Sequence, residues 1–232
     1  MSVRIAARVT FVAAAAVSVF ACSQSEPEVA YAQSARASTP ATTGVQSDAA
    51  KRAALKLVLA PTGNEARYRV REQLMSHDLP NDAVGETKNL TGWISFDSNG
   101  KVIRDASKFT VDASSFVSDQ DRRDGYVRRR LLESDSYPQV VLVPTEITGV
   151  KLPLPTSGSA PITMKADLTV RGVTHPTTWT GTASFANGGV SGKAATAFTF
   201  DDIQLDQPRV PVLLSVADTI KLEIDFNLVQ QR

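Results

Sequence analysis

The 232-residue chain lacks a second cysteine, an excess of charge of either sign and a long hydrophobic run. Its single cysteine, Cys22, excludes an intramolecular disulfide. Lys plus Arg number 25 and Asp plus Glu 24, so the net charge is +1 and there is no basic surplus of the kind that nucleic-acid binding needs. The apolar run of residues 9–21 is too short to span a bilayer as a stable helix.

The usual catalytic and metal-binding patterns are also missing. The two histidines, His77 and His175, have no further His or Cys at metal-ligand spacing, so the sequence predicts neither a metal nor another cofactor. We interpret His175 as a turn residue before Pro176. Residues 98–101 match S-x-x-K but fall in a predicted turn, and no K-T-G, nucleophile elbow, P-loop or dinucleotide fingerprint is present. No catalytic residue is therefore predicted.

The first residues are typical of a bacterial export signal. Arg4 and Arg8 precede the apolar run of residues 9–21, and Cys22 follows it in a sequence that resembles a lipobox. Residues 1–22 are thus predicted to be a signal peptide after which Cys22 is lipidated. Cleavage after Ala32, in an A-x-A pattern, is the alternative. Either way the protein is expected to be exported, as a periplasmic protein or as a lipoprotein anchored in the envelope membrane.

The remainder divides into a tether and one folded domain. Residues 23–54 are mostly Ala, Ser, Thr and Gln with little to bury, which predicts a flexible tether. Residues 55–232 are long enough for a single all-β domain with a sizeable core.

Alternation of apolar and polar residues is clearest in residues 162–185. Every second residue from Ile162 to Val170 is apolar, Gly172 interrupts the pattern, and the alternation resumes from Thr177 to Phe185. A period of two places one face of a strand on a core and the other in water. This stretch therefore predicts an antiparallel hairpin, in which Pro176 starts the second strand.

Further strands are predicted along most of the domain, at residues 55–60, 67–74, 89–96, 102–111, 139–148, 190–200 and 219–229. Turn sequences at residues 61–64, 97–100 and 187–189 separate them. One helix is expected over residues 118–133, capped by Ser118 or Asp119, with Val127 and Leu131 facing inward. The five arginines of this segment are balanced by acidic residues, which indicates a solvated, internally paired face rather than a phosphate site.

About eight one-sided strands can hide their apolar faces in a closed barrel, although a two-sheet sandwich fits the pattern almost as well. Short motifs in the same order resemble the YceI-like family and cover residues 55–230: residues 109–112, 118–124, 137–138 and 168–176. The resemblance implies an extended, antiparallel, lipocalin-like β-barrel with one short helix. It also implies a lumen that holds a long-chain isoprenoid-like lipid.

The ligand-binding residues predicted from this combination are apolar or small side chains on the inward faces: Phe109, Leu168, Trp179, Gly181, Ala183, Phe198, Ile220, Leu222, Ile224 and Phe226. We expect Gly181 and Ala183 to leave room along the barrel axis, although small residues also permit close packing of strands.

The leading function predicted from the sequence is non-enzymatic binding, storage or transport of an isoprenoid-like lipid in the cell envelope. The alternatives are a structural envelope protein whose barrel is packed solid, and an enzyme that acts on such a lipid at a site without a recognisable motif. The sequence leaves open whether two barrels form a homodimer.

Overall fold

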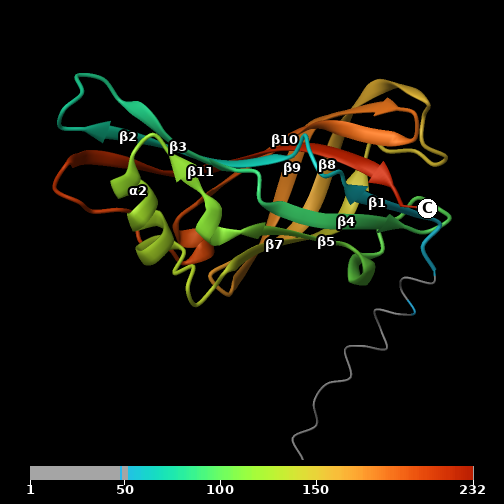
Figure 1. Ribbon diagram of the computed structural model, residues 1–232, viewed down its shortest axis with the longest axis horizontal. Coiled ribbons are helices and arrows are strands. Elements are labelled where there is room, and N and C mark those ends of the chain that lie inside the picture. The colour runs from blue at the N-terminus through green and yellow to red at the C-terminus, as the bar shows by residue number, and fades with distance from the viewer. Residues whose placement is uncertain (1–47, 49–51, 232) are drawn as a thin grey trace, which may run out of the picture. The chain divides into compact units, whose positions relative to one another are not determined.

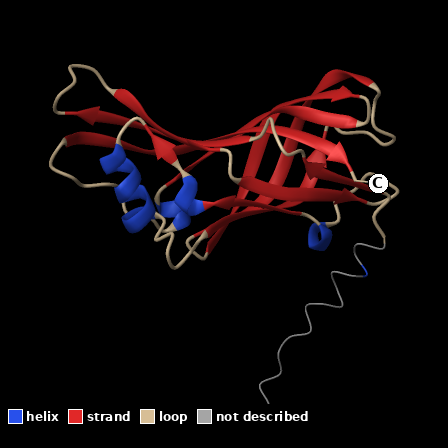
Figure 2. Cartoon of the chain, in the orientation of Figure 1, coloured by secondary structure: helices blue, strands red, loops and turns tan. Residues whose placement is uncertain are grey.

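Strands make up most of the structure, a computed structural model that describes Asp48 and residues 52–231 (Figures 1 and 2). The predicted signal peptide, Cys22 and nearly all of the predicted tether lie outside the described residues. Eleven strands belong to one sheet: β1 (Leu55–Leu59), β2 (Glu65–Leu74), β3 (Asn81–Thr87), β4 (Leu90–Phe96), β5 (Lys108–Asp112), β6 (Val117–Ser118), β7 (Gln139–Thr148), β8 (Ser157–Val170), β9 (Val173–Ala186), β10 (Gly189–Thr199) and β11 (Leu213–Gln230).

Eight of these strands close into an antiparallel barrel. The order is β1-β4-β5-β7-β8-β9-β10-β11, and β1 closes the ring because it pairs with β4 on one side and β11 on the other. Most neighbours are consecutive in the chain, as in a meander. The predicted closed barrel is confirmed, and the two-sheet sandwich is not what forms.

The long strand β11 has two successive partners on the same edge. Residues from Leu213 to Asp225 pair with β2, and those from Leu228 to Gln230 pair with β1. The sheet continues from β2 to β3 and β6, which extends it beyond the barrel at the left of Figure 1. The sequence did not predict β3 or β6.

The predicted antiparallel hairpin forms as β8 and β9, with its apolar face towards the core. Leu168 pairs with His175 and Met164 with Trp179, and Ile162, Ala166 and Trp179 are buried. Strand β9 begins at Val173, however, so Pro176 and His175 lie inside the strand and not at its start or in a turn. Pro176 is tolerated because β10 pairs with β9 only from Thr180 onward, which leaves the other edge of this part of β9 without a strand ladder.

Residues 102–111 do not form the single strand that was predicted. Val102 makes an isolated bridge to Phe96, a short 3₁₀ helix follows at Arg104–Ala106, and β5 starts only at Lys108. Ser107 is the physical reason. Its hydroxyl donates to the carbonyl of Ile103 at 2.8 Å and accepts from the amide of Ser95 at 2.9 Å, so a side chain replaces part of the strand ladder.

The predicted helix is shorter than expected. It comprises α2 (Asp121–Tyr126) and a π-helical turn at Val127–Leu131, and Gln120 occupies the N-cap position without a side-chain cap. Ser118 belongs to β6 instead. Its hydroxyl and amide both donate to the buried carboxylate of Asp124, at 2.6 and 2.9 Å. Further short 3₁₀ turns occur at Ala113–Ser115 and Asp201–Ile203.

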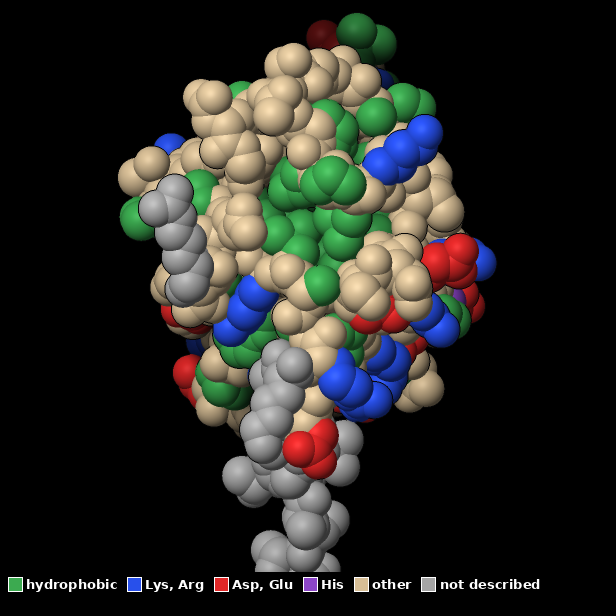
Figure 3. Space-filling model, turned by 90° about the vertical axis from the view of Figure 1, so that its right-hand side faces the viewer, with side chains coloured by type: hydrophobic (Ala, Val, Ile, Leu, Met, Phe, Trp, Pro, Cys, Tyr) green, Lys and Arg blue, Asp and Glu red, His purple; other side chains and the backbone are tan. Residues whose placement is uncertain are grey.

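Two hydrophobic clusters fill different parts of the domain. The first contains Leu168, Trp179, Phe198 and Ile220 with partly buried neighbours, and the second contains Leu57, Phe96, Ala183, Phe185 and Leu228. Figure 3 views the end of the barrel at the right of Figure 1, where β1 begins and β4 ends. Hydrophobic side chains occupy the middle of this face, surrounded by polar groups and backbone.

Candidate functional site

An internal cavity of about 630 Å³ lies where the barrel meets the β2–β3–β6 extension and α2. Its walls come from every strand of the sheet except β1 and β6, from the helical segment and from the loop before β11. Exposed residues also line it, among them Ser76, His77, Gln120 and Val212, so the cavity reaches the surface between the β2–β3 turn, that loop and the start of α2. We call this opening the mouth.

The lining is predominantly apolar. Leu168, Val170 and Trp179 come from the hairpin, Ile220, Leu222 and Ile224 from β11, and Val140 and Leu142 from β7. Concave sites of 300 to about 1,000 Å³ with such walls are typical of small-molecule pockets, and apolar contact is the interaction they offer. The cavity therefore suits a slender apolar molecule.

The structure brings most of the predicted ligand-binding residues together. Those that line the cavity are Phe109, Leu168, Trp179, Phe198, Ile220, Leu222 and Ile224. Ala183 is 1% exposed and packs in the second cluster, and Phe226 contacts both clusters.

Gly181 serves close packing and leaves no space along the axis. A Cβ atom at this position would stand 1.9 Å from the carbonyl oxygen of Lys193 and 2.7 Å from the Cα of Ala194. The missing side chain thus allows the backbones of β9 and β10 to approach each other. Of the two interpretations that the sequence left open, the structure supports close packing here.

Sequence reasoning missed the walls that come from outside the barrel. On β2, Tyr68, Val70 and Leu74 face the cavity, and Val127 and Leu131 face it from the helical segment. The signal was present in part. Val127 and Leu131 were expected to face inward, and β2 has Ala66, Tyr68, Val70 and Leu74 on one face, with Glu72 as the one charged residue among them. The sequence did not indicate that the apolar faces of β2 and of the helical segment enclose part of the barrel's lumen.

On β9, Trp179 lines the cavity, whereas Ala183, further along the strand, packs in the second cluster. The indole N–H of Trp179 donates to the hydroxyl of Thr177 at 2.9 Å, and that hydroxyl donates to the carbonyl of Ala166 at 2.9 Å. All three residues are buried. Because the polar atom of the ring is satisfied, the indole is held in place and can present its apolar surface to the cavity.

One buried ion pair interrupts the apolar wall near α2. The Arg123 guanidinium donates to the Glu72 carboxylate at 2.6 Å, and their side chains are 14% and 8% exposed. Arg123 also pairs with Asp119. The arginine therefore connects the helix to β2 in addition to making one of the pairs within the segment that the sequence predicted. Tyr68 lines the same wall, and burial raises the pKa of its hydroxyl to about 12.

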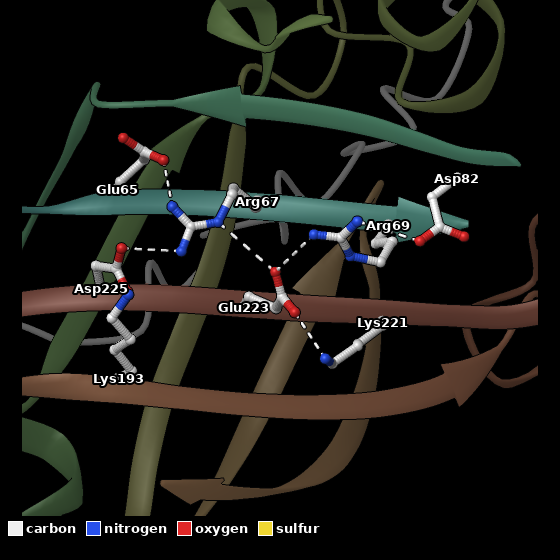
Figure 4. Close-up of polar contacts among 8 residues, drawn as sticks. All are labelled: Glu65, Arg67, Arg69, Asp82, Lys193, Lys221, Glu223 and Asp225. Atoms are coloured by element: carbon white, nitrogen blue, oxygen red, sulfur yellow. Dashed lines mark hydrogen bonds and ion pairs between the residues drawn. The ribbon is translucent and has the colours of Figure 1, made fainter. Parts of the chain in front are cut away.

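Charged residues on the other face of β2 hold this strand against β11 (Figure 4). The Arg67 guanidinium contacts Glu65, Asp225 (2.9 Å) and Glu223 (3.6 Å), and Arg69 lies 3.5 Å from Glu223. The Lys221 ammonium, 2.7 Å from Glu223, holds the pKa of that carboxyl below its ordinary value. A partly buried network of this size stabilises more than isolated surface pairs do. It fixes the strand that carries the outer wall of the cavity.

Among the described residues, no group of His, Cys, Asp and Glu side chains has the arrangement of a metal site. The same part of the chain contains no helix that is long and apolar enough to cross a membrane.

Comparison with solved structures identifies proteins of similar fold. The polyisoprenoid binding domain from Saccharophagus degradans, implicated in plant cell wall breakdown, superimposes with a TM-score of 0.57 at 13% identity, covering 76% of this chain and 99% of that domain. BcnA from Burkholderia cenocepacia gives a TM-score of 0.52 at 14% identity, covering 71% of this chain and 95% of BcnA. No curated protein matches the chain significantly by sequence.

A closed, eight-stranded antiparallel barrel with an apolar internal cavity defines a lipocalin-like class of protein. The family model of the YceI-like domain matches residues 58–228, which is most of the chain. The protein therefore belongs to the YceI-like family, as the sequence motifs had predicted.

Proposed function

We propose that the protein binds a long-chain isoprenoid-like lipid without chemically converting it, as a carrier or store in the bacterial cell envelope. The observation that carries the proposal is the apolar cavity of about 630 Å³ that opens at the surface. A barrel filled throughout by side chains, the structural alternative, would have no such space. The similarity in fold to the polyisoprenoid binding domain from Saccharophagus degradans supports the choice of lipid class.

Size and wall chemistry set what the cavity can accept. A water-sized group occupies roughly 30 Å³, so 630 Å³ holds roughly 20 carbon atoms, or about four isoprene units. Each buried methylene contributes about 0.8 kcal/mol, so a chain of this length needs no specific hydrogen bond to bind. A longer chain would extend through the mouth.

The direct test is organic extraction of the purified full-length protein followed by mass spectrometry, together with titration of the delipidated protein with a polyprenyl alcohol. We expect an isoprenoid chain in the extract and saturable binding of the alcohol with one site per chain. A straight-chain fatty acid or phospholipid in the extract would overturn the isoprenoid class. Lipid-free protein that also fails to bind the alcohol would overturn lipid binding altogether.

We also propose that the domain is anchored in the envelope through Cys22. The position of this sole cysteine directly after the apolar run supports the proposal. The wild-type protein should fractionate with membranes, and Cys22→Ser should shift it to the soluble fraction with an unchanged far-UV circular dichroism spectrum. Isolation of wild-type protein that begins at Gln33 without lipid would contradict the anchor and favour the alternative cleavage site.

A further inference from the structure

The most exposed apolar side chains in the described part of the chain gather at one end of the domain. Leu79, Met75, Leu214 and Val212 are 76%, 66%, 63% and 56% exposed, and every other large hydrophobic side chain there is less exposed than these four. We call these four residues the apolar tip. Their concentration is notable because scattered single exposures are normal, whereas clustered ones mark interaction sites.

The apolar tip consists of two segments that lie side by side. Met75 and Leu79 belong to the turn between β2 and β3, Val212 directly precedes β11, and Leu214 is the second residue of β11. The Met75 amide donates to the Val212 carbonyl at 3.0 Å, and Leu74 pairs with Leu213. In Figure 1 both segments project at the left, at the end of the domain away from the C-terminus.

The tip adjoins the mouth of the cavity. Val212 lines the cavity itself, as do Leu74, Ser76 and His77 from the neighbouring turn. Val212 therefore belongs both to the exposed tip and to the cavity lining, so the two apolar surfaces meet at the mouth. This contact indicates that the apolar phase that covers the tip also supplies the ligand of the cavity.

We propose that the apolar tip inserts into the surface of a lipid bilayer and presents the mouth of the cavity to it. This inference rests on the proposed lipid-binding function. A ligand that leaves the bilayer at the mouth enters the cavity without exposing its methylenes to water, which would otherwise oppose transfer.

Local hydrogen bonding makes the tip suitable for insertion. Backbone groups that enter the apolar region of a bilayer must be satisfied internally. In the turn, the His77 amide donates to the Leu74 carbonyl at 3.2 Å, and the His77 carbonyl accepts from the Gln73 side chain at 2.5 Å. In the other segment the Leu213 amide donates to the Val210 carbonyl at 3.0 Å.

Size and charge favour a bilayer over a protein partner. A stable protein interface buries about 800 Å² on each side, more than four side chains on two projecting segments can supply. Asp78, in the turn of the tip, is acidic, whereas Arg209 in the loop before β11 and Arg122 at the mouth are basic. The exposed Asp206 and Asp121 accompany these two arginines along the chain. The charges near the tip are therefore of both signs and give no basic surplus for anionic lipid headgroups. Insertion should therefore depend on apolar contact, occur on neutral phosphatidylcholine and persist at high salt.

A dye at a single residue tests the insertion in the full-length chain. It is needed because a bulk binding assay would also record vesicle binding by the N-terminal segment. In a Cys22→Ser background, Leu79→Cys is labelled with an environment-sensitive dye and mixed with phosphatidylcholine vesicles that contain brominated lipid. The matched control is Ser98→Cys, in the exposed turn after β4 towards the opposite end. We expect a blue shift and quenching at position 79 and neither at position 98, with the same result in high salt.

The rate of lipid transfer from vesicles to the protein provides the second test. The triple variant Met75→Gln, Leu79→Gln, Leu214→Gln changes residues that lie outside the cavity lining. Loss of three inserting side chains should slow transfer of a fluorescent polyprenyl alcohol from vesicles by about tenfold or more. Its binding to the same alcohol delivered from cyclodextrin should stay within about twofold of wild type.

The outcomes separate this inference from the proposed function. A dye at position 79 that stays in water, or equal transfer by the wild type and the triple variant, would overturn the insertion while leaving lipid binding from cyclodextrin intact. Concentration-dependent self-association that the triple variant abolishes, without a bilayer signal, would assign the tip to a second copy of the chain instead. Failure to bind the alcohol from cyclodextrin would overturn the proposed function, whatever the dye reports.

Discussion

Two substitutions on one strand test whether the lumen is hollow in one half and solid in the other. Leu222 and Leu228 lie on the inward face of β11, six residues apart, but Leu222 lines the cavity and Leu228 is 8% exposed within the second cluster. Leu222→Trp and Leu228→Trp introduce the same volume into these two places. The pair therefore controls for strand, face and residue type at once.

The expected effects are opposite. At position 222 the indole displaces about two ligand methylenes, worth about 0.8 kcal/mol each, so polyprenyl alcohol binding should weaken by about 1.6 kcal/mol, or roughly 15-fold. The free energy of unfolding of the empty protein should change by less than about 1 kcal/mol, because the ring enters space. At position 228 overpacking should cost about 1 to 3 kcal/mol, a fall in Tm of roughly 2 to 12 °C, with little change in affinity.

The assays are fluorescence titration with the alcohol and thermal unfolding of delipidated protein, followed by circular dichroism. Equal destabilisation by both substitutions, with no selective loss of binding at position 222, would refute the division of the lumen. Such a result would mean that side chains fill the cavity in solution.

Two further predictions concern the polar part of the cavity wall. Because burial raises the pKa of Tyr68 from 10 to about 12, its protonated form favours folding, and this contribution is intact below pH 10 and lost as pH rises towards 12. At pH 11 this contribution to the free energy of unfolding has fallen by about 1.4 kcal/mol. Urea denaturation of the wild type and of Tyr68→Phe should show that the variant lacks this fall. An equal dependence of the free energy of unfolding on pH in both proteins would contradict the assignment to Tyr68. Separately, Arg123→Met should destabilise the protein by about 3 kcal/mol or more because Glu72 loses its buried partner, and adding Glu72→Gln should restore much of this in a double-mutant cycle. Additive losses would show that the two charges do not interact.

Alternation in the sequence was sufficient to predict most of the barrel strands and β2, but not the strands β3 and β6 that complete the extension. The buried residues of strand β3 are Ala83, Gly85 and Thr87, none of them large and apolar, and the ring of Tyr68 covers Gly85. A Cβ atom at Gly85 would lie 2.2 Å from this ring. A strand whose inward face is filled from its neighbour has no apolar periodicity of its own, so the pattern that revealed the other strands was missing there.

The same limit applies to the glycines. Gly181 and Gly192 stand on facing strands, and each would place a Cβ atom about 2 Å from a carbonyl oxygen of the opposite strand. From the sequence alone, a small inward residue is equally consistent with empty space and with close backbone approach. The distinction depends on the separation between strands, which no local pattern records.

The position of the cavity follows from the change of partner along β11. Where β11 pairs with β1, from Leu228 onward, the ring consists of eight strands, and a barrel of this size is just wide enough for side chains to fill. From Leu213 to Asp225, β11 pairs with β2 instead, and the perimeter widens to include β2, β3, β6 and the helical segment. Side chains of ordinary size cannot fill the larger cross-section, so space remains on that side of Trp179. Leu222 and Leu228 therefore have the same sequence pattern and different surroundings, because closure of the sheet, not alternation, determines whether an inward side chain meets a neighbour or a ligand.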